Sequence, residues 1–373
     1  MAGKSITMLA VGDLVLEDEH GERFISLAAP TLKTGDVVVG QGEIVFTSRG
    51  VQTYVEMGGP SPGCPPSNMN ALASSGFNVI TLAGNHIWDM GVHGIEDTVT
   101  GLKKLGIAVT GGGMNIDEAR KPAIIEHEGT RFGFLSYNCV GTMGQWATKL
   151  KPGCAYVHII SHYEMNGANP GGPPDVYTFA EPHSLEAMED DVKKLRSQCD
   201  VLVVAFHKGV LGFPDKLAMY DRQVSRAAID AGADLVLGHH AHILKGIEEY
   251  KGKFIFHGLG HFIFDVATLP QEFRSPLGVS PGAPLFAERF NPGIEPASRW
   301  TIIAKCIVDY GKISRVGYIP CWINEERQTE VLKHDKKGQE MFDFMGTITK
   351  GAGLNIRYAW EGDEVTAFTA ENK

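Results

Sequence analysis

Carboxylate, amide and imidazole side chains stand at or just after the ends of several short apolar segments of this sequence. These residues are Asp13, Glu43, Asn85, His86, His207, His239, His240 and His242. The carboxyl ends of strands in an open α/β sheet line a common crevice, so separate loops could bring these side chains together. Carboxylate oxygens and imidazole nitrogens suit Mn, Zn, Fe or Co better than Ca or Mg, which favour all-oxygen shells. The spacing therefore predicts a site for a divalent transition metal.

Each of these residues also has an ordinary explanation when it is taken alone. A single histidine after a strand is commonly a hydrogen-bonded core or loop residue, and Gly12-Asp13 is a common turn sequence. The informative feature is that several separate strand ends each carry a ligand type. The six cysteines are scattered and form no CxxC pair, which argues against a structural zinc site and a disulfide framework.

The segments that carry these residues alternate between apolar strands and amphipathic helices. Residues 201–206 form an almost continuous apolar run, as expected for a strand that is covered on both faces. A second strand is predicted at 78–83, and helices are predicted around 95–105, 184–195 and 219–231. This alternation predicts an α/β fold with a largely parallel or mixed sheet.

A single domain is predicted over residues 1–330, with a C-terminal helix and tail over 331–373 packed on it. Two segments within the domain, near 164–175 and 270–296, are irregular and rich in Gly and Pro. Long loops on a rigid scaffold commonly control access or specificity. We expect these two segments to act either as lids or as dimer contacts. The second role would make the protein a homo-oligomer.

The composition excludes several classes of protein. Of 373 residues, 43 % are hydrophobic and 21 % are charged, which is ordinary for a soluble globular chain. The formal net charge of −10 argues against a nucleic-acid partner. No segment approaches the roughly 18 apolar residues of a membrane helix, and the N-terminus lacks a signal-peptide pattern. We expect a cytoplasmic protein that acts on a small molecule or a peptide.

The motifs together resemble a known family. In order they are Gly12-Asp13, Gly84-Asn85-His86, His207 and Gly238-His239-His240-Ala241-His242, followed by the stretch 256–262. This set is similar to the calcineurin-like metallophosphoesterase superfamily, and more closely to its CapA branch, the poly-γ-glutamate synthesis proteins. The resemblance covers about residues 6–265. It implies a four-layer α/β/β/α sandwich with mixed sheets and a metal site at the sheet edge.

The resemblance also implies roles for individual residues. The implied ligands for one or two ions of Mn, Zn, Fe or Co are Asp13, Glu43, Asn85, His207, His240 and His242. His86 is the implied general acid, and His239 is expected to support the metal site. Two positions depart from the superfamily pattern. Val15 stands where a histidine ligand is usual, and Ile87 stands where an acid is usual, so that Asp89 is left to orient His86.

These assignments favour a metal-dependent hydrolase of an anionic ester or of an amide or peptide. The ion would activate a water and His86 would protonate the leaving group, with His207 and Asp89 also in the catalytic set. Arg49, Lys208 and His261 are candidates for contacting the substrate. One alternative on the same site is a Cα epimerase, with an acid and a base drawn from His86, His207, His261 and Asp89. Another is a non-enzymatic assembly factor for poly-γ-glutamate or capsule.

Overall fold

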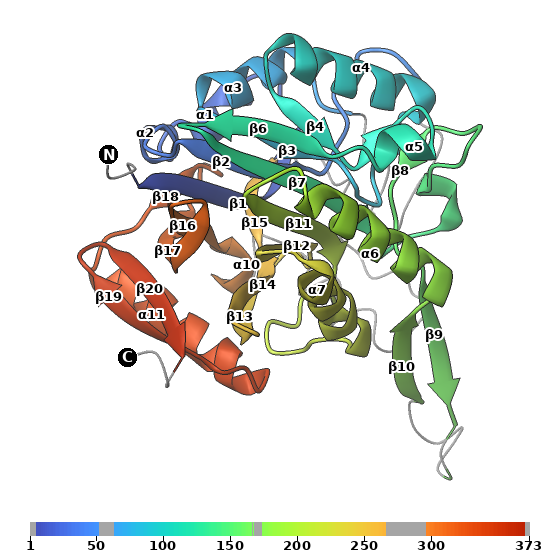
Figure 1. Ribbon diagram of the computed structural model, residues 1–373. Coiled ribbons are helices and arrows are strands. Elements are labelled where there is room, and N and C mark those ends of the chain that lie inside the picture. The colour runs from blue at the N-terminus through green and yellow to red at the C-terminus, as the bar shows by residue number, and fades with distance from the viewer. Residues whose placement is uncertain (1–4, 52–62, 166, 168–173, 266–295, 370–373) are drawn as a thin grey trace.

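Two β-sheets lie face to face between two layers of helices (Figure 1). The computed structural model describes residues 5–51, 63–165, 167, 174–265 and 296–369. Within these residues one sheet has ten strands and the other has six. Two small two-stranded ribbons lie outside the main sheets.

The first sheet has the strand order β19-β20-β17-β16-β1-β2-β3-β4, with β15 beside β1 and β18 beside β17. Strands β1 to β4 and β15 run parallel, whereas β16 pairs with β1 in the antiparallel direction. The strands are β1 (Ile6–Leu16), β2 (Val37–Gly42), β3 (Val79–Thr81), β4 (Ala108–Thr110), β15 (His261–Asp265), β16 (Trp300–Asp309), β17 (Lys312–Ile323), β18 (Thr329–Val331), β19 (Ile356–Glu361) and β20 (Glu364–Thr369).

The second sheet has the strand order β13-β14-β12-β11-β7-β6. Its four central strands are parallel, and the two edge strands are antiparallel to their neighbours. The strands are β6 (Ala123–His127), β7 (Thr130–Asn138), β11 (Val201–Lys208), β12 (Leu235–His240), β13 (Leu244–Tyr250) and β14 (Lys253–Leu259). Every residue of β11 is buried, as its apolar sequence predicts.

Most of the helices cover the outer faces of the sheets, whereas the last two pack against the core between the sheets. The helices are α1 (Glu22–Ile25), α2 (Ala29–Leu32), α3 (Met69–Ser74), α4 (Gly91–Lys104), α5 (Ile116–Ala119), α6 (Pro182–Arg196), α7 (Met219–Ala231), α10 (Pro296–Arg299) and α11 (Lys336–Gly351). Side chains of α1 to α4 share an apolar core with β1, β2 and β3. Side chains of α6 and α7 share another with β7, β11 and β12.

A third apolar core fills the space between the two sheets. It joins Met8 and Val39 of the first sheet to Val203 and Leu237 of the second. Alternate residues of one strand therefore face two different cores, because successive side chains of a strand point to opposite faces. Three cores separate four layers, which confirms the predicted α/β/β/α sandwich with mixed sheets.

The C-terminal segment differs from the tail that the sequence suggests. Helix α11 begins and ends close to the predicted helix and packs on β13, β17 and β19. The following residues form the hairpin β19–β20, and β20 pairs with β17. This pairing extends the first sheet. Alternating apolar residues of β20, such as Val365 and Ala367, are buried in the core between the sheets.

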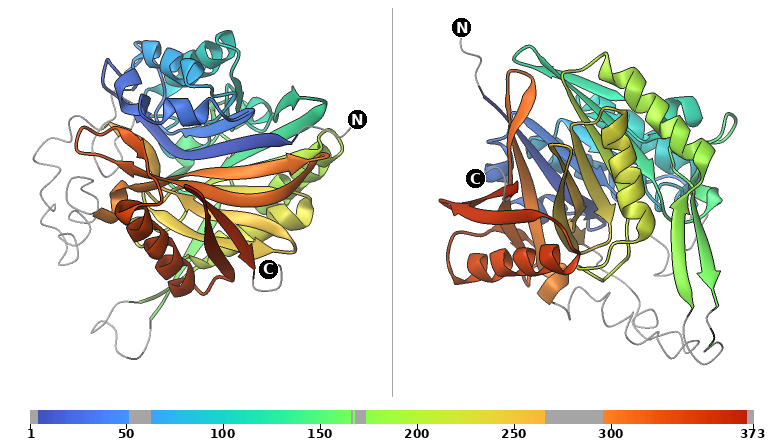
Figure 2. Two further views of the ribbon diagram at one scale, coloured as in Figure 1. Left: turned by 90° about the vertical axis from the view of Figure 1, so that its left-hand side faces the viewer. Right: turned by 60° about the horizontal axis from the view of Figure 1, so that its bottom comes forward.

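The two Gly/Pro-rich segments are only partly described. The segment 164–175 joins β9 (Ile159–Glu164) to β10 (Asp175–Ala180), an antiparallel ribbon that extends away from the body in Figures 1 and 2. Residues 166 and 168–173 lie outside the described residues, and so does 270–296 except Pro296. The prediction that these segments are lids or dimer contacts stays a prediction.

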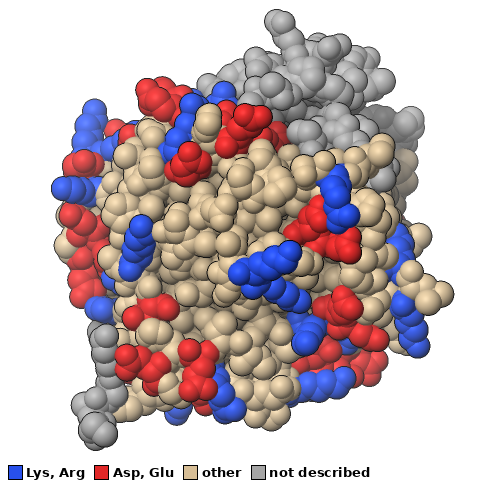
Figure 3. All heavy atoms as spheres, turned by 90° about the horizontal axis from the view of Figure 1, so that it is seen from above, with Lys and Arg blue, Asp and Glu red and all other residues tan. Residues whose placement is uncertain are grey.

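The surface over α3 and α4 carries charges of both signs. Figure 3 shows Lys and Arg interspersed there with Asp and Glu, without a field of one sign. The six cysteines are buried and form no disulfide, as expected from their spacing. None of the helices described here has the length and apolarity needed to cross a bilayer.

Candidate metal centre

The strand ends bring the predicted ligands together where the two sheets meet. Asp13 lies inside β1 rather than after it, because the strand continues to Leu16. Glu43 directly follows β2, while His207 lies in β11 and His240 ends β12. The backbone N–H of His240 donates a hydrogen bond of 3.1 Å to Asp13 Oδ2, which joins one sheet to the other.

One group of ligand atoms has the spacing of a metal site. Ligand atoms of Asp13, Glu43, His242 and His261 all lie within 4.8 Å of one another. His242 Nε2 is 3.3 Å from Glu43 Oε1, and His242 Nδ1 is 3.8 Å from Asp13 Oδ2. His242 Nδ1 is also 3.0 Å from His261 Nδ1. The group combines two carboxylates and two imidazoles, the donor set that suits a divalent transition metal.

A second group adjoins the first at Glu43. His207 Nε2 is 2.6 Å from Asn85 Oδ1 and 3.9 Å from Glu43 Oε1. The rings of His207 and His240 lie with their centroids 4.9 Å apart. Glu43 thus lies between His242 on one side and His207 on the other. Glu43, which the resemblance implies as a ligand, is therefore placed beside both groups.

Several buried polar atoms of these groups fit a bound cation. Asp13 Oδ1, His207 Nδ1 and His240 Nδ1 are buried without a hydrogen-bond partner among the described residues. The carboxylate of Asp13 is fully buried, and within the described part of the chain no lysine or arginine contacts it. A buried carboxylate without a compensating cation is costly. A divalent cation would remove that cost.

The histidines of the centre are held in the neutral form that binds metals. Burial lowers the pKa of His240 and of His242 to about 3. Burial, and then the neighbouring histidines, lower the pKa of His207 well below its ordinary value. Neutral imidazole is the form that ligates a metal. The site is therefore ready to accept an ion without first losing protons at neutral pH.

The backbone around the centre is unusual in two places. His240 has a φ of 79° and His242 has a φ of 55°, both in the left-handed region that costs a non-glycine residue energy. Gly12 faces the carbonyl of Gly260, which would lie 1.9 Å from a Cβ at position 12. Glycine before Asp13 therefore lets β1 approach the chain that carries His261.

His86 and Asp89 form a pair beside the cluster. His86 Nδ1 lies 2.7 Å from Asp89 Oδ2, and Asp89 is buried. Burial raises the pKa of Asp89, while the hydrogen bond to His86 opposes that rise. This contact agrees with the expectation that Asp89 orients His86. Nδ1 is the ring nitrogen that Asp89 holds.

Two predicted substrate contacts are not brought to the cluster. The Arg49 guanidinium is ion-paired with Glu96 and Asp97 on α4, at 2.9 and 2.5 Å. Lys208 is completely buried, with its Nζ 3.7 Å from Asp221 Oδ1. Successive residues of β11 point to opposite faces, so Lys208 turns away from the side that His207 faces. In this arrangement neither side chain is placed to contact an anionic substrate at the cluster.

His261 and His239 both lie against Asp13, but only one of them departs from its expected role. The sequence predicts a substrate contact for His261, yet one of its ring nitrogens belongs among the clustered ligand atoms. The pairing of β15 with β1 sets His261 opposite Asp13, a long-range contact that no local pattern indicates. His239 Nδ1 lies 3.5 Å from Asp13 Oδ1, so its ring lies beside the carboxylate without a hydrogen bond, and its supporting role stays a prediction.

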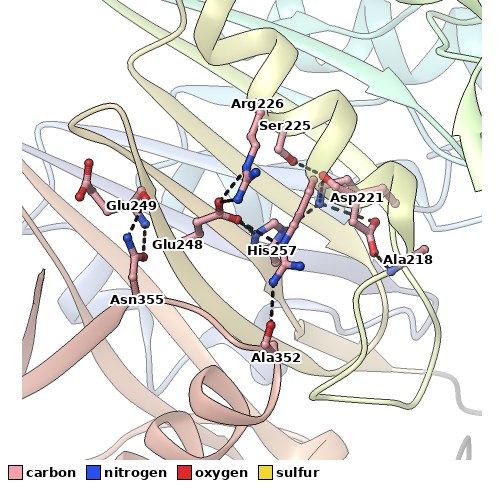
Figure 4. A network of polar contacts seen from close by, with 11 residues as sticks. Ala218, Asp221, Ser225, Arg226, Glu248, Glu249, His257, Ala352 and Asn355 are labelled. Atoms are coloured by element: carbon pink, nitrogen blue, oxygen red, sulfur yellow. Dashed lines mark hydrogen bonds and ion pairs between the residues drawn. The ribbon is translucent and has the colours of Figure 1, made fainter.

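A second buried polar group, which no sequence motif indicates, is drawn in Figure 4. His257 Nε2 lies 2.8 Å from Glu248 Oε2, and Arg226 Nε donates to Glu248 Oε1 at 2.9 Å. Asp221, at the start of α7, accepts from the backbone N–H of Ala218 at 2.7 Å. We call this set, with Lys208, the buried ion network. Charged residues within otherwise apolar strands are the sequence feature that could have indicated this network.

A four-layer α/β/β/α sandwich with carboxylates and histidines gathered at its strand ends is the architecture that the resemblance to metallophosphoesterases implies. A family model described as bacterial capsule synthesis protein PGA_cap matches residues 7–266. The chain belongs to this family, which confirms the resemblance to CapA proteins.

Two curated relatives support the same assignment. The capsule biosynthesis protein CapA of Bacillus anthracis is 27% identical over 271 residues, which span 70% of this chain and 60% of the relative. The PGA biosynthesis protein CapA of Bacillus subtilis is 27% identical over 254 residues, 67% of this chain and 59% of the relative. The chain therefore matches about three-fifths of the length of these relatives.

Solved structures show weaker likeness. A hypothetical protein from Thermus thermophilus aligns with a TM-score of 0.47 and 15% identity, over 84% of this chain and 98% of that one. The calcineurin-like phosphoesterase YfkN from Bacillus subtilis aligns with a TM-score of 0.43 and 12% identity, over 93% and 98%. These scores are low, and the fold assignment rests on the strand order and the three cores described above.

Proposed function

We propose that this protein is a metal-dependent hydrolase of an anionic ester or amide. The observation that supports the proposal is the group of Asp13, Glu43, His242 and His261, whose ligand atoms lie within 4.8 Å of one another. Asn85, His207 and His240 offer a second, adjoining set that shares Glu43 with the first. A bound ion would supply a water of lowered pKa and a positive charge beside the scissile group.

The residues of the chain itself would do the remaining work. Asp89 holds His86 through Nδ1 at 2.7 Å, which fixes the ring so that Nε2 can give a proton to the leaving group. The side chain of His86 is 20% exposed, whereas Asp89 is buried, so the pair presents its proton donor outward. The 2.6 Å contact between His207 Nε2 and Asn85 Oδ1 orients Asn85, the residue before His86.

The relatives indicate the biological setting that we propose for this hydrolysis. Their names assign them to capsule biosynthesis and PGA biosynthesis. We propose that this chain acts in the handling of a similar anionic polymer or of its precursor. The non-enzymatic assembly role is the competing possibility, because the fold and the ligands could be kept for binding alone.

The test begins with protein purified without chelator and assayed for metal content. Phosphomonoester, phosphodiester and γ-glutamyl anilide probes are then incubated with the chain before and after addition of Mn²⁺, Zn²⁺ or Co²⁺. We expect metal-dependent cleavage of one probe class, which His86→Gln slows by about 100-fold or more and the exposed-helix variant His183→Gln leaves intact. Cleavage that survives complete metal removal would contradict the proposal.

The same incubations distinguish the epimerase alternative. In deuterated water, candidate peptides that gain deuterium at Cα while every peptide bond survives would replace hydrolysis by proton transfer. Binding of the polymer with neither cleavage nor exchange would favour the assembly role. Cleavage without Cα deuterium is the outcome that the proposed hydrolase requires.

A further inference from the structure

His261 is fixed against the centre by strand pairing and by ring contacts. Strand β15 runs parallel to β1, and the register sets His261 opposite Asp13. The ring of His261 stacks on the ring of His242 with centroids 4.3 Å apart and an interplanar angle of 21°. Phe264 contacts the His261 ring, with centroids 3.9 Å apart. His261 is buried, so these contacts leave its ring little freedom.

The two rings also make a polar contact through their Nδ1 atoms, and this contact is bent rather than head-on. His242 Nδ1 and His261 Nδ1 are 3.0 Å apart. A head-on N–H···N bond of that length would separate the ring centres by about 5 Å, because each ring adds about 1 Å between its centre and its nitrogen. The observed rings are closer than that and nearly parallel. Their nitrogen edges therefore lie side by side.

The two Nδ1 atoms would serve as ligands of one ion if the rings tilted so that their in-plane lone pairs met at it. With metal–nitrogen bonds of about 2.0–2.1 Å, ligands at tetrahedral or octahedral angles lie about 2.9–3.4 Å apart. The neighbouring carboxylate of Asp13 has its Oδ1 buried without a hydrogen-bond partner among the described residues. The position two residues beyond Asp13 is the apolar, buried Val15, which offers no nitrogen.

We infer that His261 is a direct metal ligand through Nδ1, and that it supplies the nitrogen that β1 lacks at Val15. Asp13, Glu43, His242 and His261 then form a site with two nitrogens and two oxygens. Such a donor set favours Zn²⁺ or Co²⁺ over Mg²⁺, which prefers oxygen. The inference rests on the metal site of the proposed function but does not need the hydrolysis.

The first test measures Co²⁺ binding to the metal-stripped full chain by calorimetry. We expect His261→Asn to weaken the tightest Co²⁺ site by more than about 100-fold, beyond the range found for residues that only support a ligand. His257→Asn removes another buried imidazole, one that belongs to the buried ion network, and should leave Co²⁺ affinity unchanged. Circular dichroism confirms that each variant is folded.

The second test gives a positive signal that a structural role would not produce. In His261→Cys, a thiolate at the same position should add a sulfur-to-Co²⁺ charge-transfer band in the near ultraviolet. The wild-type chain, whose six cysteines are buried and do not belong to the group of clustered ligand atoms, is the blank. If the Asn variant keeps its Co²⁺ affinity, or the Cys variant binds Co²⁺ without the band, His261 is not a ligand. Failure of hydrolysis alone would leave these results untouched.

Discussion

The metal centre and the buried ion network are both charged groups in the interior, yet they are balanced in different ways. In the network, Lys208 lies 3.7 Å from Asp221, and Glu248 contacts both His257 and Arg226. In the centre, Asp13 contacts histidine side chains and a backbone N–H. The network supplies its own cations, whereas the centre keeps a carboxylate that a metal ion could neutralise. Burial of charge alone does not distinguish a structural group from a binding site, but the source of the counter-charge does.

The largest effect is expected when the carboxylate of the centre is removed. Asp13→Asn should weaken Co²⁺ binding by more than about 100-fold, because the buried negative charge is lost. The metal-free variant should be at least as stable as the metal-free wild type, since an uncompensated buried charge has been removed. Calorimetry and urea unfolding in chelator measure the two results. A marked loss of metal-free stability would mean that the centre is balanced without metal.

The same kind of change in the network should have the opposite result. Asp221→Ala leaves Lys208 buried without its counter-ion and should lower the free energy of unfolding by about 3–5 kcal/mol. The Co²⁺ affinity of the folded chain should not change. Asp215→Ala, at a partly exposed aspartate beside Lys216, is the control and should cost less than about 0.5 kcal/mol. Loss of Co²⁺ binding in the Asp221 variant would show that metal binding at the centre depends on the network.

Removal of His86 should separate chemistry from metal binding within the centre. His86→Gln is expected to lower the rate of probe hydrolysis by about 100-fold or more, since a positioned general acid contributes that much. Asp89→Asn should lower the rate in the same direction by less. Neither variant should release the metal, which elemental analysis checks. An unchanged hydrolysis rate in His86→Gln would assign proton transfer to another group.

A further effect concerns the stability of the metal-free chain at lowered pH. His240 and His242 have pKa values of about 3 in the folded chain, below the ordinary value of 6.5. The unfolded chain therefore binds more protons between these pH values, and stability falls as the pH drops from 6.5 towards 3. The slope should be at most about 1.4 kcal/mol per pH unit for each histidine.

Urea unfolding in chelator at several pH values tests this dependence. The variant His240→Asn lacks one of the two groups, so its slope should be shallower than that of the wild type. An equal slope in both proteins would show that other groups control the acid sensitivity. Asp221→Asn, in the network, offers a comparison in which both centre histidines are retained.

Local features of the fold could be predicted from the sequence. The strand at 201–206 and the helix at 219–231 are visible as an apolar run and a helical period, and they occur as β11 and α7. Asp13, Glu43 and His207 could be grouped because strand ends in such folds converge. These predictions need only residue types and their spacing.

Long-range pairing could not be predicted in the same way. The contact between His261 and Asp13 depends on β15 lying beside β1, which joins segments far apart in the chain. Lys208 follows His207 directly, so the sequence suggests one site for both, whereas the alternation of β11 sends them to opposite faces. The partners of Arg49 lie on α4, almost fifty residues away, and no local pattern connects them to it.

The central position of strand β1 also affects how its backbone amides exchange hydrogen with the solvent. The strand is hydrogen-bonded along both edges, to β2 on one side and, in succession along the strand, to β16 and β15 on the other. The amide of Asp13 donates to the carbonyl of Gly260, deep in this arrangement. Backbone amides of this kind exchange with solvent only when the whole domain unfolds, whereas an outlying ribbon such as β9–β10 can open alone. Asp13 is thus anchored in the part of the chain that should be the last to exchange its hydrogens.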